Sequence, residues 1–434
     1  MKKLLALLLA FLVPLIGSGA AQAFGAKRID VAKGEDVWFA EDHTLPMIAL
    51  VASFPAGSVY DPPGKNGLAL FGSAMLSEGA GKLNAKAFHD ALADKAIQLS
   101  AEADHDWIVV TLVTLSANAK DAFKLLGLAL AHPRFDADAI QRVRAQMLRN
   151  LDRKDEDPAE VASREFDRLF FAGHPYAHAS DGDRPGIAAI ARADLAGFVA
   201  SHVVRGGLKI AVAGDVDAKT LSDYLKSTFG PLSPRQPPSP PRAGRLGAVG
   251  VHAVAMAVPQ PNIAFGVPGV LRSDKDFLPA YVANYILGGG GFSSRLMHDV
   301  REKRGLTYDI STDLTDLKRA GAIEGLVATR ADAVKETIQT LRDTMAKFAA
   351  DGPTVQELTD AKTYLTGSYP LAFASNAGTA AQLASFQRAG LDVGYVARRN
   401  GLIAAVTLDD VRRAAKRLFD PKRLTIVVAG TAKK

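Results

Sequence analysis

The chain has 434 residues, of which 48% are hydrophobic, and it contains no cysteine. The lack of cysteine excludes a disulfide framework. The formal net charge of +6 comes from basic residues scattered among acidic ones, which argues against a nucleic-acid-binding stripe. A chain of this length predicts two or three domains.

The first 23 residues predict a secretory signal peptide. Lys2 and Lys3 precede an apolar run from Leu4 to Ile16, and Ala21-Gln22-Ala23 supplies a small-residue cleavage site. This run is too short to span a bilayer, and a buried N-terminal helix is the disfavoured alternative. We therefore expect a mature periplasmic protein that begins at Phe24.

Residues 24–230 predict a first half in which strands and helices mix without a regular βαβ rhythm. Apolar residues predict a strand over Met47–Phe54 and a helix over Gly67–Leu76. Helical periodicity follows at Ala119–Ala131 and Asp138–Leu151. Such a pattern favours an α+β fold with antiparallel sheets, each covered on one face by helices.

The histidines of the first half offer one weak metal candidate. His174 and His178 have a one-turn spacing, but Pro175 lies between them, so a loop or a helix start is the favoured interpretation. A relocated metal set of these two residues with Asp181 is a minor alternative. Asp104-His105-Asp106 predicts solvated residues of a turn or a strand edge rather than metal ligands.

A proline-rich segment divides the mature chain. Residues 231–246, which begin PLSPRQPPSPP, predict an extended, semi-rigid linker because proline neither continues a helix nor pairs inside a sheet. Residues 247–434 form the predicted second half, with a strand at Val249–Val258 and three helices. These helices are expected at Asp276–Leu287, Val334–Ala349 and Val355–Thr366.

The second half repeats the first. Ile187–Ile190 recurs as Ile403–Val406, and Leu208–Gly214 recurs as Leu424–Gly430, each 216 positions later. A constant offset across a helix and the following strand indicates duplication of a unit of about 200 residues.

The stretch from residue 288 to 308 contains the most distinctive residues. It opens with four glycines, which free the backbone for close approach to another chain. Ser293-Ser294 predicts the start of a helix that ends at Gly305, and the alternation over Leu306–Ile310 predicts a strand. This turn can bring Arg301 and Tyr308 side by side. The chain shows no cysteine nucleophile and no Gly-x-Ser-x-Gly elbow.

These residues resemble the inverted-motif zinc peptidases of the pitrilysin, insulinase and mitochondrial processing peptidase group. The resemblance spans nearly the whole mature chain, including Ala40–Phe71, the duplication and VREKRGLTYDI at Val300–Ile310. Catalytic members carry H-x-x-E-H, in which two His bind zinc and the Glu activates water, and a more distant Glu is the third ligand. The resemblance implies two homologous halves in a clam-like peptidase fold.

The metal-site positions of that family are all replaced in this chain. The matching residues are Leu70, Ser73 and Ala74, and the family's spacing of 76 residues from Ala74 leads to Asn150. None of these side chains binds zinc tightly or takes a proton from water near neutral pH. The resemblance therefore implies that the chain alone holds no zinc and does not hydrolyse peptides by the family's mechanism.

The second half keeps the family's Arg and Tyr, which hold the substrate carbonyl and the developing oxyanion. Arg301 and Tyr308 match that pair in type and spacing, whereas an offset of 209 aligns them with Leu92 and Leu99 of the first half. The alternative is an ordinary solvated arginine and a packing tyrosine.

The resemblance implies a non-catalytic subunit of a periplasmic heterodimeric zinc endopeptidase. Its partner would be a homologue that retains H-x-x-E-H and zinc, and Arg301 and Tyr308 would act in trans on the peptide substrate. The glycine run resembles a substrate-handling loop of the family, with a flexible turn between helices as an equal alternative. This run comprises Gly288, Gly289, Gly290 and Gly291. A second possibility for the whole protein is a homodimer that binds peptides, or acts as a scaffold, without cutting them.

Overall fold

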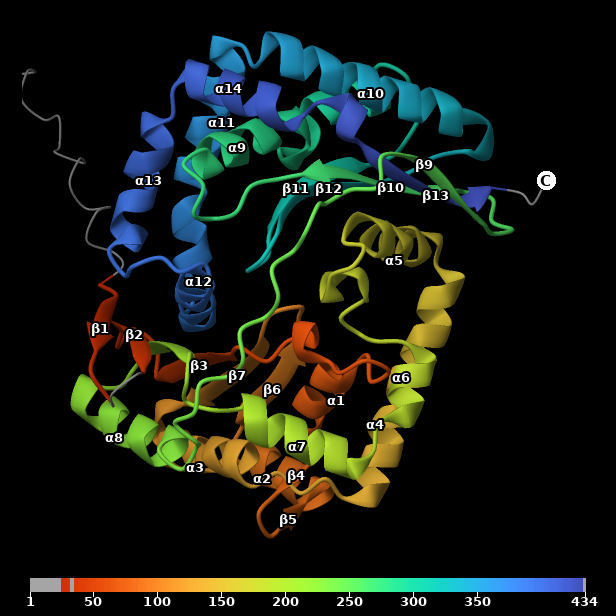
Figure 1. The fold of residues 1–434 in the computed structure, drawn as a ribbon. Coiled ribbons are helices and arrows are strands. Elements are labelled where there is room, and N and C mark those ends of the chain that lie inside the picture. Colours follow the sequence, from red (N-terminus) through yellow and green to blue (C-terminus); the bar gives the residue numbers. More distant parts are fainter. Residues whose placement is uncertain (1–24, 32–34, 432–434) are drawn as a thin grey trace, which may run out of the picture.

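Figure 1 shows the computed structural model of the chain, which describes residues 25–31 and 35–431. The predicted signal peptide of residues 1–23 lies outside these residues. The first half lies at the bottom of this view and the second half at the top. No helix in the described part of the chain has the length and apolar character needed to cross a membrane.

The first half is built on a six-stranded sheet with the order β1-β2-β8-β3-β7-β6. Neighbouring strands are antiparallel except β2 and β8, which are parallel, so the expected antiparallel sheet is in fact mixed. The predicted strand is present as β3, where it is buried along almost its whole length at the middle of the sheet. The strands are β1 (Lys27–Ile29), β2 (Asp36–Glu41), β3 (Met47–Phe54), β6 (Gln98–Ala103), β7 (Ile108–Leu115) and β8 (Lys209–Gly214).

Helices of the first half cover one face of this sheet with a shared apolar core. The predicted helices at 67–76, 119–131 and 138–151 correspond to α1, α3 and α4, and α4 continues five residues further. A small hairpin of β4 (Gly79–Ala80) and β5 (Leu83–Asn84) follows α1. The helices are α1 (Leu68–Met75), α2 (Ala85–Ala93), α3 (Ala119–Ala131), α4 (Ala137–Glu156), α5 (Pro158–Phe170), α6 (Arg184–Ala189), α7 (Arg192–His202) and α8 (Ala218–Phe229).

The second half repeats the strand order of the first. Its five-stranded sheet runs β9-β13-β10-β12-β11, and β9 and β13 are again the parallel pair. This order corresponds to β2-β8-β3-β7-β6, which confirms the duplication. The strands are β9 (Gly250–Ala255), β10 (Asn262–Pro268), β11 (Ile310–Asp316), β12 (Gly321–Ala328) and β13 (Thr425–Thr431).

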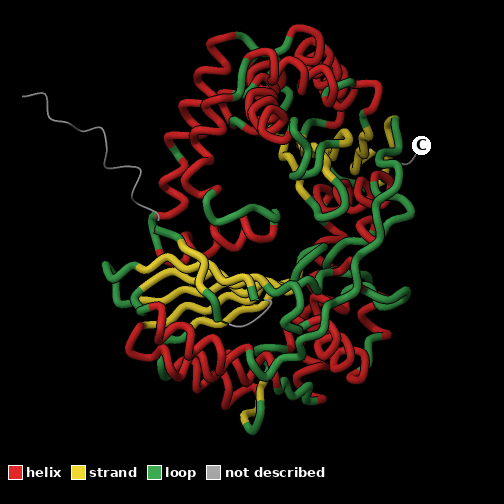
Figure 2. Tube along the Cα trace, turned by 60° about the vertical axis from the view of Figure 1, so that its left-hand side comes forward, coloured by secondary structure: helices red, strands yellow, loops and turns green. Residues whose placement is uncertain are grey.

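The predicted helices of the second half are also present. The one expected at 276–287 ends its regular part at Asn284, because a π-helical turn over Tyr285–Gly289 follows. Figure 2 shows the two sheets apart, each with most helices on the side away from the other sheet. The helices are α9 (Phe277–Asn284), α10 (Val334–Asp351), α11 (Val355–Gly367), α12 (Asn376–Arg388), α13 (Tyr395–Ala405) and α14 (Leu408–Leu418).

The halves exchange one helix each. In Figure 1, α5 of the first half lies against β10 and β13, and α12 of the second half lies against the lower sheet. Phe166 and Phe170 of α5 pack with Val427 of β13, while Leu383 of α12 packs with Val51 of β3. The sequence predicted helical cover on one face of each sheet only. The second face is partly covered as well, by a helix from the other half.

Hydrogen bonds fix both ends of α12 on the first sheet. At its start, Asn376 Nδ2 donates to Met47 O over 3.0 Å. Near its end, Gln387 Nε2 donates to Asp36 O over 2.7 Å. Because buried polar groups that lose such partners are costly, these bonds specify where the apolar face of α12 docks.

Two equivalent turns meet between the halves. Asp106 lies in the turn between β6 and β7, and Lys318 lies in the corresponding turn between β11 and β12. Asp106 Oδ1 accepts from Tyr176 Oη at 2.6 Å, and Oδ2 accepts from Lys318 N at 2.8 Å. The prediction of a turn was correct, but the prediction of a solvated Asp106 was wrong, because only 4% of this residue is exposed.

The linker at 231–246 contains no helix or strand. The first half holds it through main-chain bonds from Arg205 N to Ser233 O (2.8 Å) and from Gly206 N to Arg235 O (3.1 Å). A Cβ at position 206 would lie 2.1 Å from Arg235 O, so glycine is required there. Just beyond the linker, Gly247 N donates to Phe170 O over 2.8 Å, which fixes the chain against α5.

Candidate functional site

The family's metal positions lie on two packed helices, α1 and α4. Leu70 and Ala74 of α1 are partly buried against the apolar core. Ser73 is fully buried, and its hydroxyl donates to Leu70 O over 2.8 Å. Asn150 of α4 accepts a hydrogen bond from the guanidinium of Arg153. Two apolar side chains, an internally bonded hydroxyl and an amide do not fit zinc.

The start of α1 is held by a carboxylate from outside the helix. Asp61 accepts from Gly67 N at 2.7 Å and from Ala69 N at 2.8 Å. Burial raises the pKa of Asp61 to about 7, although the main-chain donors act in the opposite direction. Gly67 has a φ of 95°, a left-handed conformation that favours glycine. This acid therefore satisfies the free N–H groups of the helix start.

Two of the three residues of the minor metal alternative, His174 and Asp181, have other side-chain partners. His174 caps a short 3₁₀ helix at Pro175–Ala177 through Nδ1, which accepts from Tyr176 N, and its Nε2 lies 3.1 Å from Pro241 O. Asp181 forms ion pairs of 3.1 Å with Lys154 and Arg164. Within residues 25–31 and 35–431, no group of three or more His, Cys, Asp or Glu side chains could hold a metal ion. The predicted helix-start position of His174 is confirmed.

The second candidate region runs from the end of α9 to the start of β11. Ser294 Oγ accepts from Met297 N at 3.3 Å, so the predicted cap is present, but the helix that follows becomes π-helical over Met297–Glu302. The predicted strand from Leu306 was wrong, because β11 begins only at Ile310. Thr307 Oγ1 donates to Ala328 O over 2.7 Å. This side-chain bond occupies an acceptor at the end of β12 and keeps Thr307 out of the regular ladder.

Arg301 and Tyr308 are neighbours, as the sequence predicted. Arg301 Cζ lies 5.4 Å from the centre of the Tyr308 ring and 4.8 Å from that of Phe292. Tyr308 is 81% exposed and Phe292 is 67% exposed. Two exposed aromatic rings therefore hold one guanidinium between them through cation–π contacts. Phe292 was not predicted, although a large apolar residue directly after a glycine run was a usable signal.

The guanidinium of Arg301 makes no hydrogen bond and no ion pair with any described residue. Nearby acids on the same helical segment are already engaged. The Asp299 carboxylate accepts hydrogen bonds from Lys303 (3.0 Å) and Thr344 (2.9 Å), and the Glu302 carboxylate is hydrogen-bonded to His298 (2.9 Å). Arg301 is thus not an ordinary ion-pair residue of this surface, and its donors are free for another molecule.

The glycine run packs mainly against its own chain. A Cβ on Gly288 would lie 2.3 Å from Thr312 Oγ1, and one on Gly290 would lie 2.8 Å from Tyr285 O. A Cβ on Gly289 would lie 3.1 Å from Asn284 Nδ2. Gly291 alone faces open space, with a φ of 56°. The close approach expected toward another chain is therefore internal at Gly288, and Gly291 offers the open backbone.

The pair can stabilise charge but cannot activate water. A guanidinium and a phenol donate hydrogen bonds to a carbonyl oxygen and to the negative charge that develops on it. The residues at positions 70, 73, 74 and 150 supply neither a metal ligand nor a general base. The described chain thus has two neighbouring donors suited to stabilising negative charge, but no metal ligand or general base at the four family positions.

Two family models match the chain. The one described as insulinase (peptidase family M16) matches residues 37–180, and the one described as the peptidase M16 inactive domain matches residues 189–365. The fold agrees with the crystal structure of a peptidase M16 inactive domain from Pseudomonas fluorescens, with a TM-score of 0.88. The two are 32% identical, over 94% of this chain and 99% of the other.

Curated relatives carry both peptidase and non-peptidase names. A Helicobacter pylori protein named non-peptidase homolog YmxG is 27% identical over 81% of each chain. A Mycobacterium bovis protein named uncharacterized zinc protease is 26% identical over 69% of each chain. Names of both kinds occur among proteins with similar sequences.

Proposed function

Because the chain belongs to the insulinase (M16) peptidase family, we propose that it is the non-catalytic subunit of a heterodimeric zinc endopeptidase of the periplasm. Its partner is a homologue that retains H-x-x-E-H and binds zinc. Arg301 and Tyr308 reach the partner's site and donate hydrogen bonds to the substrate carbonyl and its oxyanion.

The observation that carries this proposal is the unpaired guanidinium of Arg301. It is displayed between Phe292 and Tyr308, and no described residue bonds it. The two large aromatic side chains beside it, Phe292 and Tyr308, are exposed together, and exposed apolar groups that cluster are typical of interaction sites. The metal positions of the same chain, in contrast, hold Leu70 and Ala74 in partly buried apolar packing.

The test compares each subunit with the pair. The mature chain is purified alone, and with an exported homologue of similar length that carries H-x-x-E-H. Zinc content is measured by mass spectrometry and cleavage with a quenched fluorescent peptide. We expect the isolated chain to bind no stoichiometric zinc and to cleave nothing, and the pair to cleave. Zinc-dependent cleavage by the isolated chain would disprove the proposal.

Variants of the pair test the residue assignment. Arg301→Ala and Tyr308→Phe should each lower kcat of the complex by roughly 10²-fold, the loss typical of removing one oxyanion donor. Arg149→Gln, which changes an exposed arginine of α4, is the matched control and should leave kcat unchanged. Association of the two subunits is measured in parallel, so that a variant that fails to form the complex is not mistaken for one with a lower kcat. Unchanged kcat in both variants would make the pair structural.

The same experiment decides the second possibility. A peptide-binding or scaffolding homodimer would self-associate without the partner and bind the uncleaved peptide. Sedimentation of the isolated chain and binding of the same peptide measure these two properties. A stable homodimer that binds the peptide, together with no activity on mixing, would replace the heterodimer proposal.

A further inference from the structure

Phe292 is a large apolar side chain that the fold does not bury. It is 67% exposed and does not belong to the buried apolar cluster of the second half. The centre of its ring lies 4.8 Å from Arg301 Cζ, which is within the range of a cation–π contact. Because Phe292 adds little to the core, its contact with Arg301 is the interaction that this side chain can contribute.

The turn that carries Phe292 is bonded to the helical segment that carries Arg301. Phe292 is the middle residue of a 3₁₀ turn at Gly291–Ser293, and the buried Ser294 donates its N–H to the main chain of this turn over 3.0 Å. Ser294 Oγ in turn accepts from Met297 N at 3.3 Å, at the start of the π-helical segment that contains Arg301. The ring and the guanidinium therefore belong to one locally bonded unit.

The first half has neither member of this contact. At the offset of 209 residues, Leu83 corresponds to Phe292 and Leu92 corresponds to Arg301. Leu83 packs against the apolar core of the first half, and Leu92 is only 7% exposed. In the second half both positions differ, since one holds an exposed ring and the other a cation. The pairing is thus specific to the half that carries the proposed donors.

Aromatic rings supply the contacts that can orient the guanidinium of Arg301. This group has no hydrogen bond or ion pair with any described residue, and an arginine without such bonds samples many rotamers. Stacking of the planar guanidinium on an aromatic face restricts these rotamers. Tyr308 is itself a proposed donor, so Phe292 is the ring that contributes position alone.

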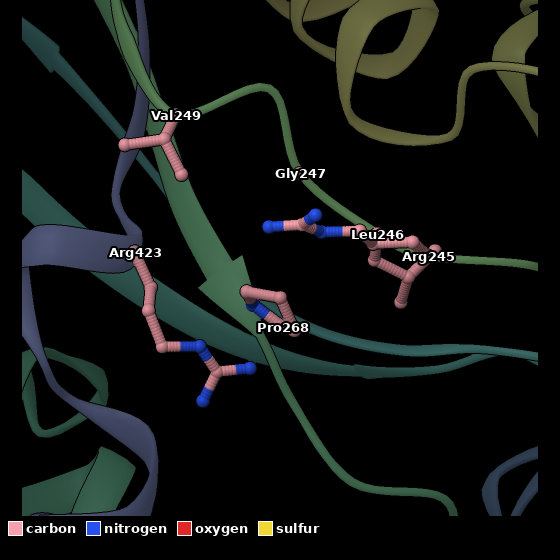
Figure 3. A pocket seen from close by; sticks show the side chains of 6 residues that line it. All are labelled: Arg245, Leu246, Gly247, Val249, Pro268 and Arg423. Carbon is pink, nitrogen blue, oxygen red and sulfur yellow. The ribbon is translucent and has the colours of Figure 1, made fainter.

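Arg245 shows an exposed arginine without such a ring. It belongs to the linker and extends its guanidinium into a pocket of about 220 Å³ (Figure 3). Leu246, Val249 and Pro268 form the apolar wall, and none of the described residues that line this pocket is aromatic. Arg245 therefore provides a reference guanidinium within the same chain.

We propose that Phe292 is a positioning residue, whose ring holds the Arg301 guanidinium where it can donate to the carbonyl oxygen of a peptide bound at the partner's zinc. Phe292 itself touches neither the peptide nor the metal. Its effect on catalysis rests on the proposed function of the complex, whereas its placement of the guanidinium is a property of this chain alone. Another aromatic ring should replace it, and an aliphatic side chain should not.

The kinetic test uses the complex with the H-x-x-E-H homologue. Phe292→Leu keeps an apolar side chain but lacks the ring, and it should lower kcat by roughly 3- to 30-fold, the range that a cation–π contact supports. KM should stay within about 2-fold of the parent, because the ring does not bind the peptide. Phe292→Tyr keeps a ring and should retain kcat. Tyr364→Leu, the matched control, removes an exposed ring that stacks on Tyr285 and should leave kcat unchanged.

A second measurement follows the guanidinium in the isolated chain. Heteronuclear NMR detects the Nε–H groups of arginine, and the resonances of Arg301 and Arg245 are identified by their loss in Arg301→Lys and Arg245→Lys. The Arg301 resonance should carry a ring-current shift that Phe292→Leu reduces and Phe292→Tyr retains. The Arg245 resonance should be the same in both variants. This measurement needs no partner, so it separates failure of the positioning role from failure of the proposed complex.

Three results would overturn the proposal. An unchanged kcat in Phe292→Leu, or an unchanged Arg301 resonance in this variant, would show that the ring does not hold the guanidinium. A higher KM or weaker association of the subunits, with kcat unchanged, would assign Phe292 to direct contact with the peptide or the partner. If the parent complex is inactive, the proposed function fails, and the Arg301 resonance still decides whether Phe292 holds this side chain.

Discussion

The two halves share their first helix but differ in the side chains of the helix that follows it. Helices α1 and α9 have the same length and are 209 residues apart at both ends, so the scaffold around them is shared. At that offset Leu92, which is 7% exposed, corresponds to Arg301, whose guanidinium lies between two exposed rings. The duplication thus kept the first helix of each half, while the following helix is regular around Leu92 and π-helical around Arg301. A repeated fold leaves each copy free to acquire its own surface chemistry.

The largest expected loss of stability comes from removing a contact between the halves. Phe166 of α5 is 2% exposed and covers the sheet at Gly266, where a Cβ would lie 2.7 Å from its ring. Phe166→Ala should lower the free energy of unfolding by about 3–5 kcal/mol, because the cavity lies between the halves. Urea unfolding followed by circular dichroism should show one shifted transition. Two transitions, with only one of them shifted, would mean that the halves unfold independently.

A smaller effect is expected at the contact between the equivalent turns. Asp106→Ala leaves the buried Tyr176 hydroxyl and Lys318 N without their acceptor. We expect the free energy of unfolding, measured by thermal unfolding, to fall by about 2–3 kcal/mol, because unsatisfied buried donors are costly. Asp106→Asn keeps one acceptor oxygen and should cost less. A change below about 0.5 kcal/mol for alanine would show that solvent replaces this contact.

The third prediction concerns an acidic pair that only the second sheet contains. Asp313 lies directly opposite Glu324 across β11 and β12, where the first sheet pairs Ser100 with Thr111. Like charges at such positions destabilise a sheet. Burial raises the pKa of Glu324 to about 7, and the carboxylate of Asp313 adds to this, while a hydrogen bond from Thr315 opposes it.

The raised pKa fixes the sign of the pH dependence. Because the folded chain holds this proton more tightly than the unfolded chain, the contribution to stability is present below about pH 4 and is lost as the pH rises through 7. Glu324→Gln should therefore be more stable than the parent by about 1–2 kcal/mol at pH 8 and similar to it at pH 4. Urea unfolding at both pH values measures this. Glu336→Gln, at an exposed position of α10, should show no such difference.

The smallest expected effect is at Arg301. Its guanidinium contributes no hydrogen bond or ion pair to the described fold, so Arg301→Ala should change the free energy of unfolding by less than about 0.5 kcal/mol. The corresponding variant of the first half, Leu92→Ala, removes a buried side chain and should cost about 2 kcal/mol or more. If both variants lost the same free energy of unfolding, Arg301 would have a structural role, contrary to this prediction.

Local pattern predicted the elements but not their partners. Helical periodicity located α3 and α10, and the constant offset revealed the duplication, because both signals lie in consecutive residues. Periodicity shows that α5 and α12 each have an apolar face, but it does not show which sheet that face meets. The exchange of these helices therefore could not be predicted, nor could the burial of Asp106.

In the candidate site too, the sequence predicted local neighbours but not contacts between different elements. Spacing placed Arg301 beside Tyr308, and the structure confirms that they are neighbours. The glycine run was misjudged at Gly288, because the contact with Thr312 joins residues on different elements. The start of β11 was misplaced for a similar reason, since the side-chain bond of Thr307 reaches the end of β12.

The helix exchange also has a consequence for the order in which the chain can fold. The helix that covers the second face of the first sheet begins only at Asn376, and β13, at Thr425–Thr431, lies in the second sheet between β10 and β9. A nascent chain therefore completes neither half before α12 and β13 have been synthesised, and until then both sheets expose apolar surface. Truncation before Thr425 would therefore be damaging, because it removes the strand that lies between β10 and β9 and pairs with both.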